Sequence, residues 1–372
     1  MLIREDQNQN ASNGYHSVEI NRVEDATSDP LEGVRNILVT GAAGFIGGWF
    51  VRRLIETHGD RYVVVCFDDL GYCASVDNFR TIRHLPNFHF VKGDVCSFPD
   101  VDRTLRKYDI DGIVHFAARS HVDASFDDPL SFTQTNVVGT HTLLEAARKI
   151  GSIRRFVYVS TDEVYGENDA SDPRGLAAFT EDDALHPTNP YSASKAAAEM
   201  IVQAYRKSFQ MPVIVTRCNN VFGPYQYPEK LISKLIMHLR KGQKMPIHGD
   251  GQTARAFVFA KDAAEALDII FHRGKEGETY NISSDSQLRV REVAEKIFGV
   301  MYRHCSQDIE EWISSVPDRL FNDSMYWTDD SKLRALGWVQ KTSFDDALET
   351  TVEWFRRESD GFWPDLRGIQ RQ

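Results

Sequence analysis

The sequence lacks the features that define several classes of protein. Its 372 residues contain no run of about 18 apolar residues, so we expect no transmembrane helix. The first residues are mostly polar and include several acids, so we expect neither a secretory signal nor a mitochondrial transit peptide. The five cysteines include no Cys-x-x-Cys pair, which argues against a disulfide framework and a zinc ribbon. We therefore expect a cytoplasmic protein without a bound metal.

A surplus of basic residues is also missing. The chain has 43 Lys and Arg against 54 Asp and Glu, for a formal net charge of −11. Nucleic-acid binders usually carry a basic stripe, so neither nucleic acid nor a membrane is an expected partner. Residues 1–33 hold two bases against seven acids and show no apolar period. This composition predicts a disordered acidic tail.

The rest of the chain alternates between buried strands and helices. Helical spacing is found over residues 45–57 and 131–149. Five short apolar runs have the length of buried strands, at residues 36–40, 62–67, 88–91, 112–116 and 155–159. This alternation is typical of parallel βαβ units, so we predict an α/β fold with a Rossmann-type doubly wound parallel sheet.

After about residue 220 the pattern changes. The expected strands are short, at 246–248 and 279–282, and the expected helices are 229–241, 262–273 and 290–302. We predict a first domain over residues 34–220 that contains the parallel sheet. A smaller, mostly helical domain follows over 221–372, and the chain is allowed to cross between the two.

Three glycines mark a candidate dinucleotide site. Gly41, Gly44 and Gly47 form Gly-x-x-Gly-x-x-Gly between a strand and a helix, which suits a tight turn, a close pyrophosphate and close helix packing. Asp68 ends the next strand, where a carboxylate binds an adenosine ribose. No Arg directly follows, so NAD is favoured over NADP. Glycines can serve turns alone, but this ordered set favours a cofactor site.

Tyr191 and Lys195 are four residues apart, one turn of a helix that begins near Pro190. An ammonium beside a phenol favours the phenolate, so Lys195 is expected to lower the pKa of Tyr191 and make it an acid/base group. Such a pair also arises often by chance, as a buried tyrosine near a surface lysine.

Asp162 and Glu163 follow the strand at 155–159, at the edge where parallel sheets expose catalytic loops. Two carboxylates in unequal environments can serve as one acid and one base. An N-cap followed by a first-turn acid explains the same residues equally well. Sequence chemistry leaves both interpretations open.

Together these motifs resemble those of the extended short-chain dehydrogenase/reductases. The segments are Gly-Ala-Ala-Gly-Phe-Ile-Gly from Gly41, Ser-Thr-Asp-Glu-Val-Tyr-Gly from Ser160 and Tyr-Ser-Ala-Ser-Lys from Tyr191. The Asp-Glu pair makes the chain similar to the nucleotide-sugar 4,6-dehydratases, from about residue 34 to Trp354. Further matches are 117–123, 219–225, 227–232 and 249–252.

The resemblance implies an NAD-dependent hydro-lyase acting on dTDP-glucose or UDP-glucose. In that mechanism Tyr191 takes the proton of the 4-hydroxyl while NAD⁺ accepts hydride from C4, and Thr161 hydrogen-bonds the 4-oxygen. Glu163 then removes the C5 proton and Asp162 protonates the leaving 6-hydroxyl. Hydride returns to C6 and gives a 4-keto-6-deoxy sugar nucleotide.

The resemblance also implies binding residues and an assembly. Arg255 and Arg319 suit a diphosphate, because guanidinium groups bind phosphate in bidentate fashion. The implied cofactor contacts are Gly41, Gly44, Phe45, Ile46, Gly47, Asp68, Asp94, Val95, Ala117, Ala118, Thr135, Tyr191 and Lys195. The implied substrate contacts are Ser120, Thr161, Asn220, Glu229, Lys230, Leu231, Arg255, Asn281 and Arg319.

Family members usually form homodimers through two long helices, here 131–149 and 190–210. Stripes of apolar side chains on these helices fit a dimer or the chain's own sheet equally well. They are Leu143, Ala146, Ala197, Ile201 and Ala204.

Two departures from the family pattern concern the pocket. Arg119 stands where the family often has Glu or Gln, and Leu320 and Phe321 lie in the stretch expected to hold the base. The nearest alternative is an epimerase or decarboxylase of the same superfamily, which generally lacks the acid pair. An alternative of another class is a cofactor-binding sensor or scaffold without catalysis, which typically loses Tyr191 or Lys195.

Overall fold

The computed structural model describes residues 31–167, 177–303, 308–317 and 327–363. Nearly all of the predicted tail, and Arg319, Leu320 and Phe321, lie outside these ranges. Within them, no helix is both long and apolar enough to cross a membrane.

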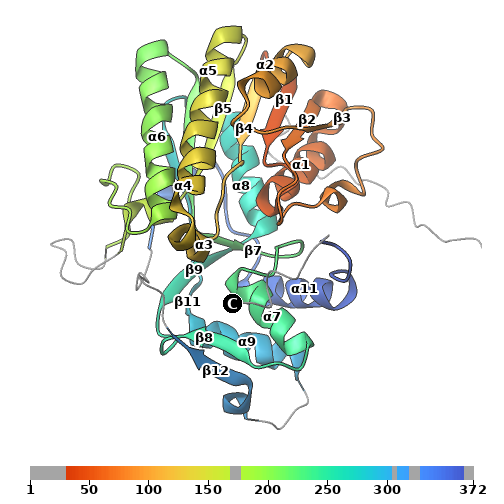
Figure 1. Ribbon diagram of the computed structural model, residues 1–372, viewed down its shortest axis with the longest axis vertical. Helices are drawn as coiled ribbons and strands as arrows, with labels where there is room; N and C mark the ends of the chain where they lie inside the picture. Colours follow the sequence, from red (N-terminus) through yellow and green to blue (C-terminus); the bar gives the residue numbers. More distant parts are fainter. Residues whose placement is uncertain (1–30, 168–176, 304–307, 318–326, 364–372) are drawn as a thin grey trace, which may run out of the picture.

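A parallel sheet of seven strands organises the larger part of the molecule (Figure 1). Its strand order is β3-β2-β1-β4-β5-β6-β10, so the chain winds outward in both directions from β1. This is the predicted doubly wound α/β sheet. The strands are β1 (Asn36–Thr40), β2 (Val63–Asp68), β3 (Phe88–Lys92), β4 (Gly112–His115), β5 (Arg155–Thr161), β6 (Val213–Cys218) and β10 (Thr279–Ile282).

Helices cover both faces of this sheet because successive strand residues point to opposite sides. Ile37 and Val39 of β1 pack with α1 (Phe45–His58) and α8 (Ala260–Arg273). Leu38 points the other way, into the core shared with three further helices. These are α2 (Phe98–Lys107), α5 (Thr140–Ile150) and α6 (Pro190–Phe209).

A smaller part lies against the carboxyl ends of the strands (Figure 1). It has its own apolar core, which includes Leu235, Phe257, Ile297 and Phe355. Its elements are β7 (Asn220–Phe222), α7 (Leu231–Arg240), β8 (Met245–His248), β9 (Ala254–Phe259), β11 (Gln287–Arg289), α9 (Val290–Met301), β12 (Ile313–Val316) and α11 (Phe344–Arg357). The short helix α10 (Ser331–Arg334) packs instead against β10 of the large sheet.

Two sequence predictions need correction. The helix at 262–273 and the strand at 279–282 were assigned to the smaller domain, but α8 packs on the large sheet beside α1, and β10 pairs with β6 and extends that sheet. Residues 131–149 are helical as predicted, but not as one regular α-helix: α4 (Pro129–Phe132) leads into a π-helical segment, Thr133–Gly139, before α5. Sequence periodicity cannot show either feature, since pairing is long-range and a π turn changes the spacing locally.

The remaining short elements connect this framework. They are α3 (Val122–Asp127) and the 3₁₀ turns Gly59–Arg61, Val76–Phe79, Asp162–Tyr165 and Ile309–Trp312. The turn Asp162–Tyr165 directly follows β5, which continues through Thr161.

Candidate functional site

A cavity of about 690 Å³ lies at the carboxyl ends of the parallel strands, between the sheet and the smaller part. All predicted catalytic and cofactor residues line it. The predicted substrate residues that also line it are Ser120, Thr161, Asn220, Glu229, Lys230, Leu231 and Arg255. The cavity therefore brings together residues that lie far apart in the sequence, from Gly41 to Arg255.

The glycine turn has the geometry of a phosphate site. Gly41 follows β1 with φ of +63°, and a Cβ there would lie 2.6 Å from the backbone nitrogen of Ala117. Gly44 caps α1 without any side-chain hydrogen bond, and the first turn contains no acid. The N–H groups of that turn have no partner within the helix and lie at its positive end. They fit an anion such as a pyrophosphate.

Asp68 occupies the predicted position at the end of β2. Its carboxylate accepts the N–H of Ala43 at 2.9 Å and of Leu70 at 2.8 Å. Burial raises the pKa of Asp68 to about 6, although these two hydrogen bonds oppose the rise. The group is thus mostly ionised at pH 7 and has acceptor capacity left for a ribose hydroxyl. These features fit a dinucleotide.

Asp162 and Glu163 have unequal environments. Asp162 is 3% exposed. Its carboxylate accepts hydrogen bonds from Asn219 Nδ2 at 2.6 Å and from Thr161 Oγ1 at 3.2 Å. Burial and the charge of Glu163 raise the pKa of Asp162 to about 7. Glu163 is less buried, and its Oε2 accepts Asn189 Nδ2 at 3.2 Å. One carboxyl is therefore suited to hold a proton near neutral pH, as an acid/base pair requires.

The Tyr191–Lys195 pair differs from its prediction. Burial, together with the charge of Glu163, raises the pKa of Tyr191, while hydrogen bonding to Thr161 acts the other way. The ammonium of Lys195 donates to Val159 O at 2.7 Å and lies 4.4 Å from the centre of the Tyr158 ring. Burial lowers the pKa of Lys195 to about 7. The expected net lowering of the Tyr191 pKa is therefore not found here, because burial and the charge of Glu163 dominate.

Asn281 does not fit its predicted contact with substrate. It is fully buried in β10, outside the cavity lining. Its amide nitrogen donates to the carbonyls of Phe179 and Asp329, and its Oδ1 accepts the hydroxyl of Tyr165. Both of its donors are used within the protein, so its role here is structural.

Several residues in the cavity were not predicted as site residues. Asn219 and Asn189 bind Asp162 and Glu163, and Tyr72 donates to Glu229 at 2.7 Å. Asn219 stands in the quoted segment 219–225, which was a usable signal. Asn189 and Tyr72 depend on contacts between distant segments, so no local pattern marks them.

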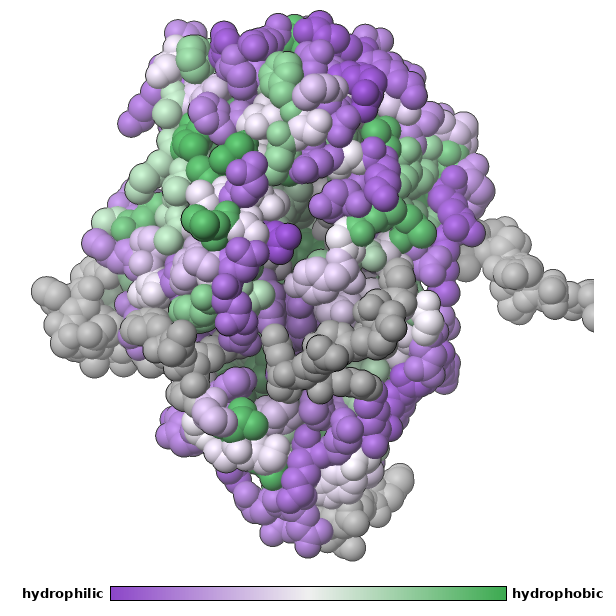
Figure 2. All heavy atoms as spheres, in the orientation of Figure 1, coloured by the Kyte–Doolittle hydropathy of each residue, from purple (hydrophilic) through white to green (hydrophobic). Residues whose placement is uncertain are grey.

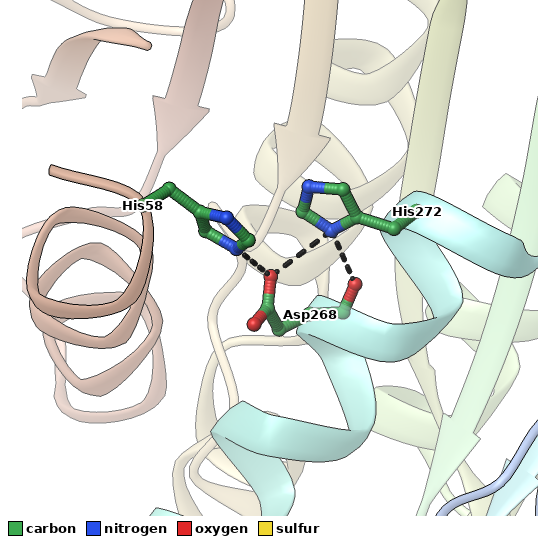
Figure 3. A group of neighbouring side chains, drawn as sticks. All are labelled: His58, Asp268 and His272. Atoms are coloured by element: carbon green, nitrogen blue, oxygen red, sulfur yellow. Dashed lines mark hydrogen bonds and ion pairs between the residues drawn. The ribbon is translucent and has the colours of Figure 1, made fainter. Parts of the chain in front are cut away.

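One group of side chains has the composition of a metal site. Figure 3 shows His58 of α1 facing Asp268 and His272 of α8. His58 Nε2 lies 2.9 Å from Asp268 Oδ1, and Arg53 Nε lies 3.2 Å from Oδ2. Burial alone would raise the pKa of Asp268, but the hydrogen bonds from both histidines hold it below its usual range. Since Asp268 already has these cationic and hydrogen-bonding partners, we assign the group to pairing of α1 with α8.

Comparison with known proteins agrees with this geometry. Residues 38–351 match the family model described as GDP-mannose 4,6 dehydratase. The chain belongs to this family. It is 40% identical over 323 residues to dTDP-D-glucose 4,6-dehydratase of Homo sapiens, covering 87% of this chain and 90% of that protein.

Two further relatives define the match. A trifunctional UDP-glucose 4,6-dehydratase, 3,5-epimerase and reductase of Arabidopsis thaliana is 46% identical over 334 residues, 90% of this chain. This chain spans only about half (49%) of that relative's length. The crystal structure of dTDP-glucose 4,6-dehydratase from Streptomyces venezuelae, with NAD bound, superposes with a TM-score of 0.81 at 38% identity and covers 88% of this chain and 99% of that one.

Proposed function

We propose that the protein is an NAD-dependent 4,6-dehydratase of a nucleoside-diphosphate glucose. The observation that carries the proposal is the Asp162–Glu163 pair, which lines the same cavity as Tyr191 and Lys195. Redox chemistry alone needs only a proton acceptor and a cofactor. Elimination of water needs a second acid and base, and this cavity contains both types of group.

The proposed roles follow from the environments. Asp162, whose pKa is about 7, gives a proton to the departing 6-hydroxyl. Glu163, more exposed, takes the proton from C5 once C4 is a ketone. Thr161 ends β5 with its hydroxyl in the cavity, where it can bind the 4-oxygen. Tyr191 takes the proton of the 4-hydroxyl.

We propose that NAD is held by the glycine turn and by Asp68. When bound in its oxidised form, NAD accepts hydride and adds a positive charge that favours the Tyr191 phenolate. The carboxylate of Asp68 would repel a 2′-phosphate, which supports NAD over NADP. The structural relative from Streptomyces venezuelae was crystallised with NAD.

The proposed substrate is UDP-glucose or dTDP-glucose. Arg255 of β9 lines the cavity and supplies a guanidinium for the diphosphate. Lys230 also lines it, with Nζ 2.5 Å from Ser120 O. We propose that the sheet part, with residues 34–220, α8 and β10, binds the cofactor, while the smaller part binds the nucleotide.

We further propose a homodimer. The predicted stripe of Leu143 and Ala146 is buried against the chain's own sheet. On α6, Ala193, Met200 and Ala204 are exposed at helical spacing, and Leu130 of α4 is 79% exposed. Hydrophobic residues gather over this region in Figure 2. A second copy of the same two-helix face would cover them.

A cytoplasmic location is proposed from the cysteines. Cys66, Cys73, Cys96 and Cys218, which lie in described segments, are free thiols. Free thiols persist in a reducing compartment.

Incubation of the purified chain with each nucleotide glucose tests the proposed function. Mass spectrometry should show loss of one water from at least one of them, with a 4-keto group that reacts with a carbonyl reagent. A product of unchanged mass would indicate an epimerase, and loss of carbon dioxide from a uronic acid would indicate a decarboxylase. Absence of any product would contradict the proposal.

A further inference from the structure

A buried arginine lies behind the two catalytic segments. Arg217 of β6 is 5% exposed, and its guanidinium binds both carboxylate oxygens of Glu199 on α6. Its Nη1 also donates to the hydroxyl of Tyr165 at 2.6 Å. One cation therefore contacts the helix that carries Tyr191 and the turn that carries Asp162.

On the helix side, Glu199 is one turn beyond Lys195 and two turns beyond Tyr191. It is 2% exposed, and its negative charge opposes the effect of burial on the Lys195 ammonium. The bidentate contact with Arg217 fixes the position of this carboxylate, because two parallel hydrogen bonds restrict both partners.

On the turn side, Tyr165 is the last residue of the turn Asp162–Tyr165. Its ring stacks on Phe179 with centroids 5.0 Å apart, and its hydroxyl donates to Asn281 Oδ1 at 2.8 Å. The phenol oxygen thus joins Arg217 to the turn at a single, fully buried point. A buried ion pair is costly to desolvate and contributes little net stability, so its value can lie in fixing one arrangement.

We propose that Arg217 is a positioning residue that holds the Asp162–Tyr165 turn in register with the Tyr191–Lys195 helix. The inference rests on the proposed function. Oxidation at C4 depends on the helix, and elimination across C5 and C6 depends on the turn. A displacement of about 1 Å between them costs on the order of 100-fold in rate.

Tyr165→Phe tests the link with the smallest change, because it removes one hydroxyl and leaves the Arg217–Glu199 pair intact. Tyr62→Phe is the matched control. Tyr62 is 1% exposed, and its hydroxyl accepts Leu31 N at 2.9 Å and lies 2.8 Å from His272 Nε2, outside the cavity. Arg217→Lys is a second variant that keeps the charge but loses the fork that reaches both partners.

For Tyr165→Phe and Arg217→Lys we expect kcat to fall about 10- to 100-fold with KM changed less than threefold. Elimination should be slowed more than oxidation. Reduced nicotinamide should therefore accumulate on the enzyme and be visible by its absorbance. Tyr62→Phe should keep wild-type kcat and show no such accumulation.

Two results would overturn the inference. One is a kcat of Tyr165→Phe within twofold of the wild-type value. The other is a fall in kcat without accumulation of reduced cofactor, if Tyr62→Phe shows the same fall. A lack of product from the unaltered chain would instead refute the proposed function and, with it, this inference.

Discussion

Asp162 and Glu163 are neighbours in the chain but not in environment. Asp162 is enclosed, accepts hydrogen bonds from Asn219 and Thr161, and lies beside a second carboxylate. Its pKa of about 7 means that the folded protein tolerates a buried, partly ionised carboxyl at neutral pH. Such a group costs stability and is retained where chemistry needs it.

This environment predicts how Asp162→Asn changes stability with pH. An unfolded Asp has a pKa of about 3.9, so the folding penalty is absent below about pH 4, grows as pH rises, and is complete above about pH 7. The variant removes that penalty. We compare the free energy of unfolding of the variant with that of wild type at each pH. The difference in favour of the variant should be larger at pH 8 than at pH 4, by up to about 4 kcal/mol.

Urea unfolding at both pH values measures this difference, with Asp60→Asn, an exposed carboxylate outside the cavity, as control. A stability difference for Asp162→Asn that does not change with pH would contradict the assigned pKa.

Most of the site residues predicted from local patterns line the cavity. The glycine turn, Asp68, the acid pair and Tyr191 with Lys195 all come from short segments whose spacing sets their geometry. Contacts between distant segments could not be predicted from local patterns. Val159 O accepts a hydrogen bond from the Lys195 ammonium, and the charge of Glu163 raises the pKa of Tyr191. The hydrogen-bond partners of the Asn281 amide are about 50 and 100 positions away in the sequence.

At the scale of elements, the turn between β1 and α1 sets how closely the helix approaches the sheet. Gly41 and Gly59 both have φ near +60°, at the start and end of the same helix. A Cβ at Gly41 would meet the backbone of Ala117, whereas a Cβ at Gly59 would meet nothing within 4 Å. Alanine at Gly59 therefore adds only backbone strain, whereas alanine at Gly41 adds the same strain and also pushes the turn away from Ala117.

Gly59→Ala should lower the free energy of unfolding by about 1 kcal/mol and leave NAD affinity unchanged. Gly41→Ala should lower NAD affinity at least tenfold, since the turn must shift away from Ala117. Isothermal titration with NAD measures both. Equal affinities in the two variants would refute the assignment of this turn to the cofactor.

The elements themselves were predicted with unequal success. Strands β1 to β5 and helix α1 follow from apolar runs that local burial dictates, and they lie within two residues of the predicted bounds. β10 was placed in the wrong layer because a four-residue strand carries no mark of its partner. The π-helical segment was missed because the apolar stripe continues past it into α5.

At the scale of the whole molecule, the uncovered face of α4 and α6 is the feature that a single copy leaves unexplained. Met200 is 62% exposed in the middle of a stripe of alanines. Met200→Glu should convert the proposed dimer to a monomer, because a two-fold interface would bury the charge in both copies at a high cost in free energy.

Sedimentation velocity measures this change. Val339→Glu, at an apolar side chain that is 53% exposed away from these helices, should leave the dimer intact. A wild-type protein that sediments as a monomer at micromolar concentration would contradict the proposed assembly.

We propose that one cavity holds the groups for oxidation at C4, elimination of water and return of the same hydride to C6. The most direct test supplies UDP-glucose or dTDP-glucose labelled with deuterium at C4 and locates the label in the product by NMR. We expect deuterium at C6 and solvent hydrogen at C5, with no net change in NAD. Deuterium that remains at C4, or appears in free NADH, would contradict it.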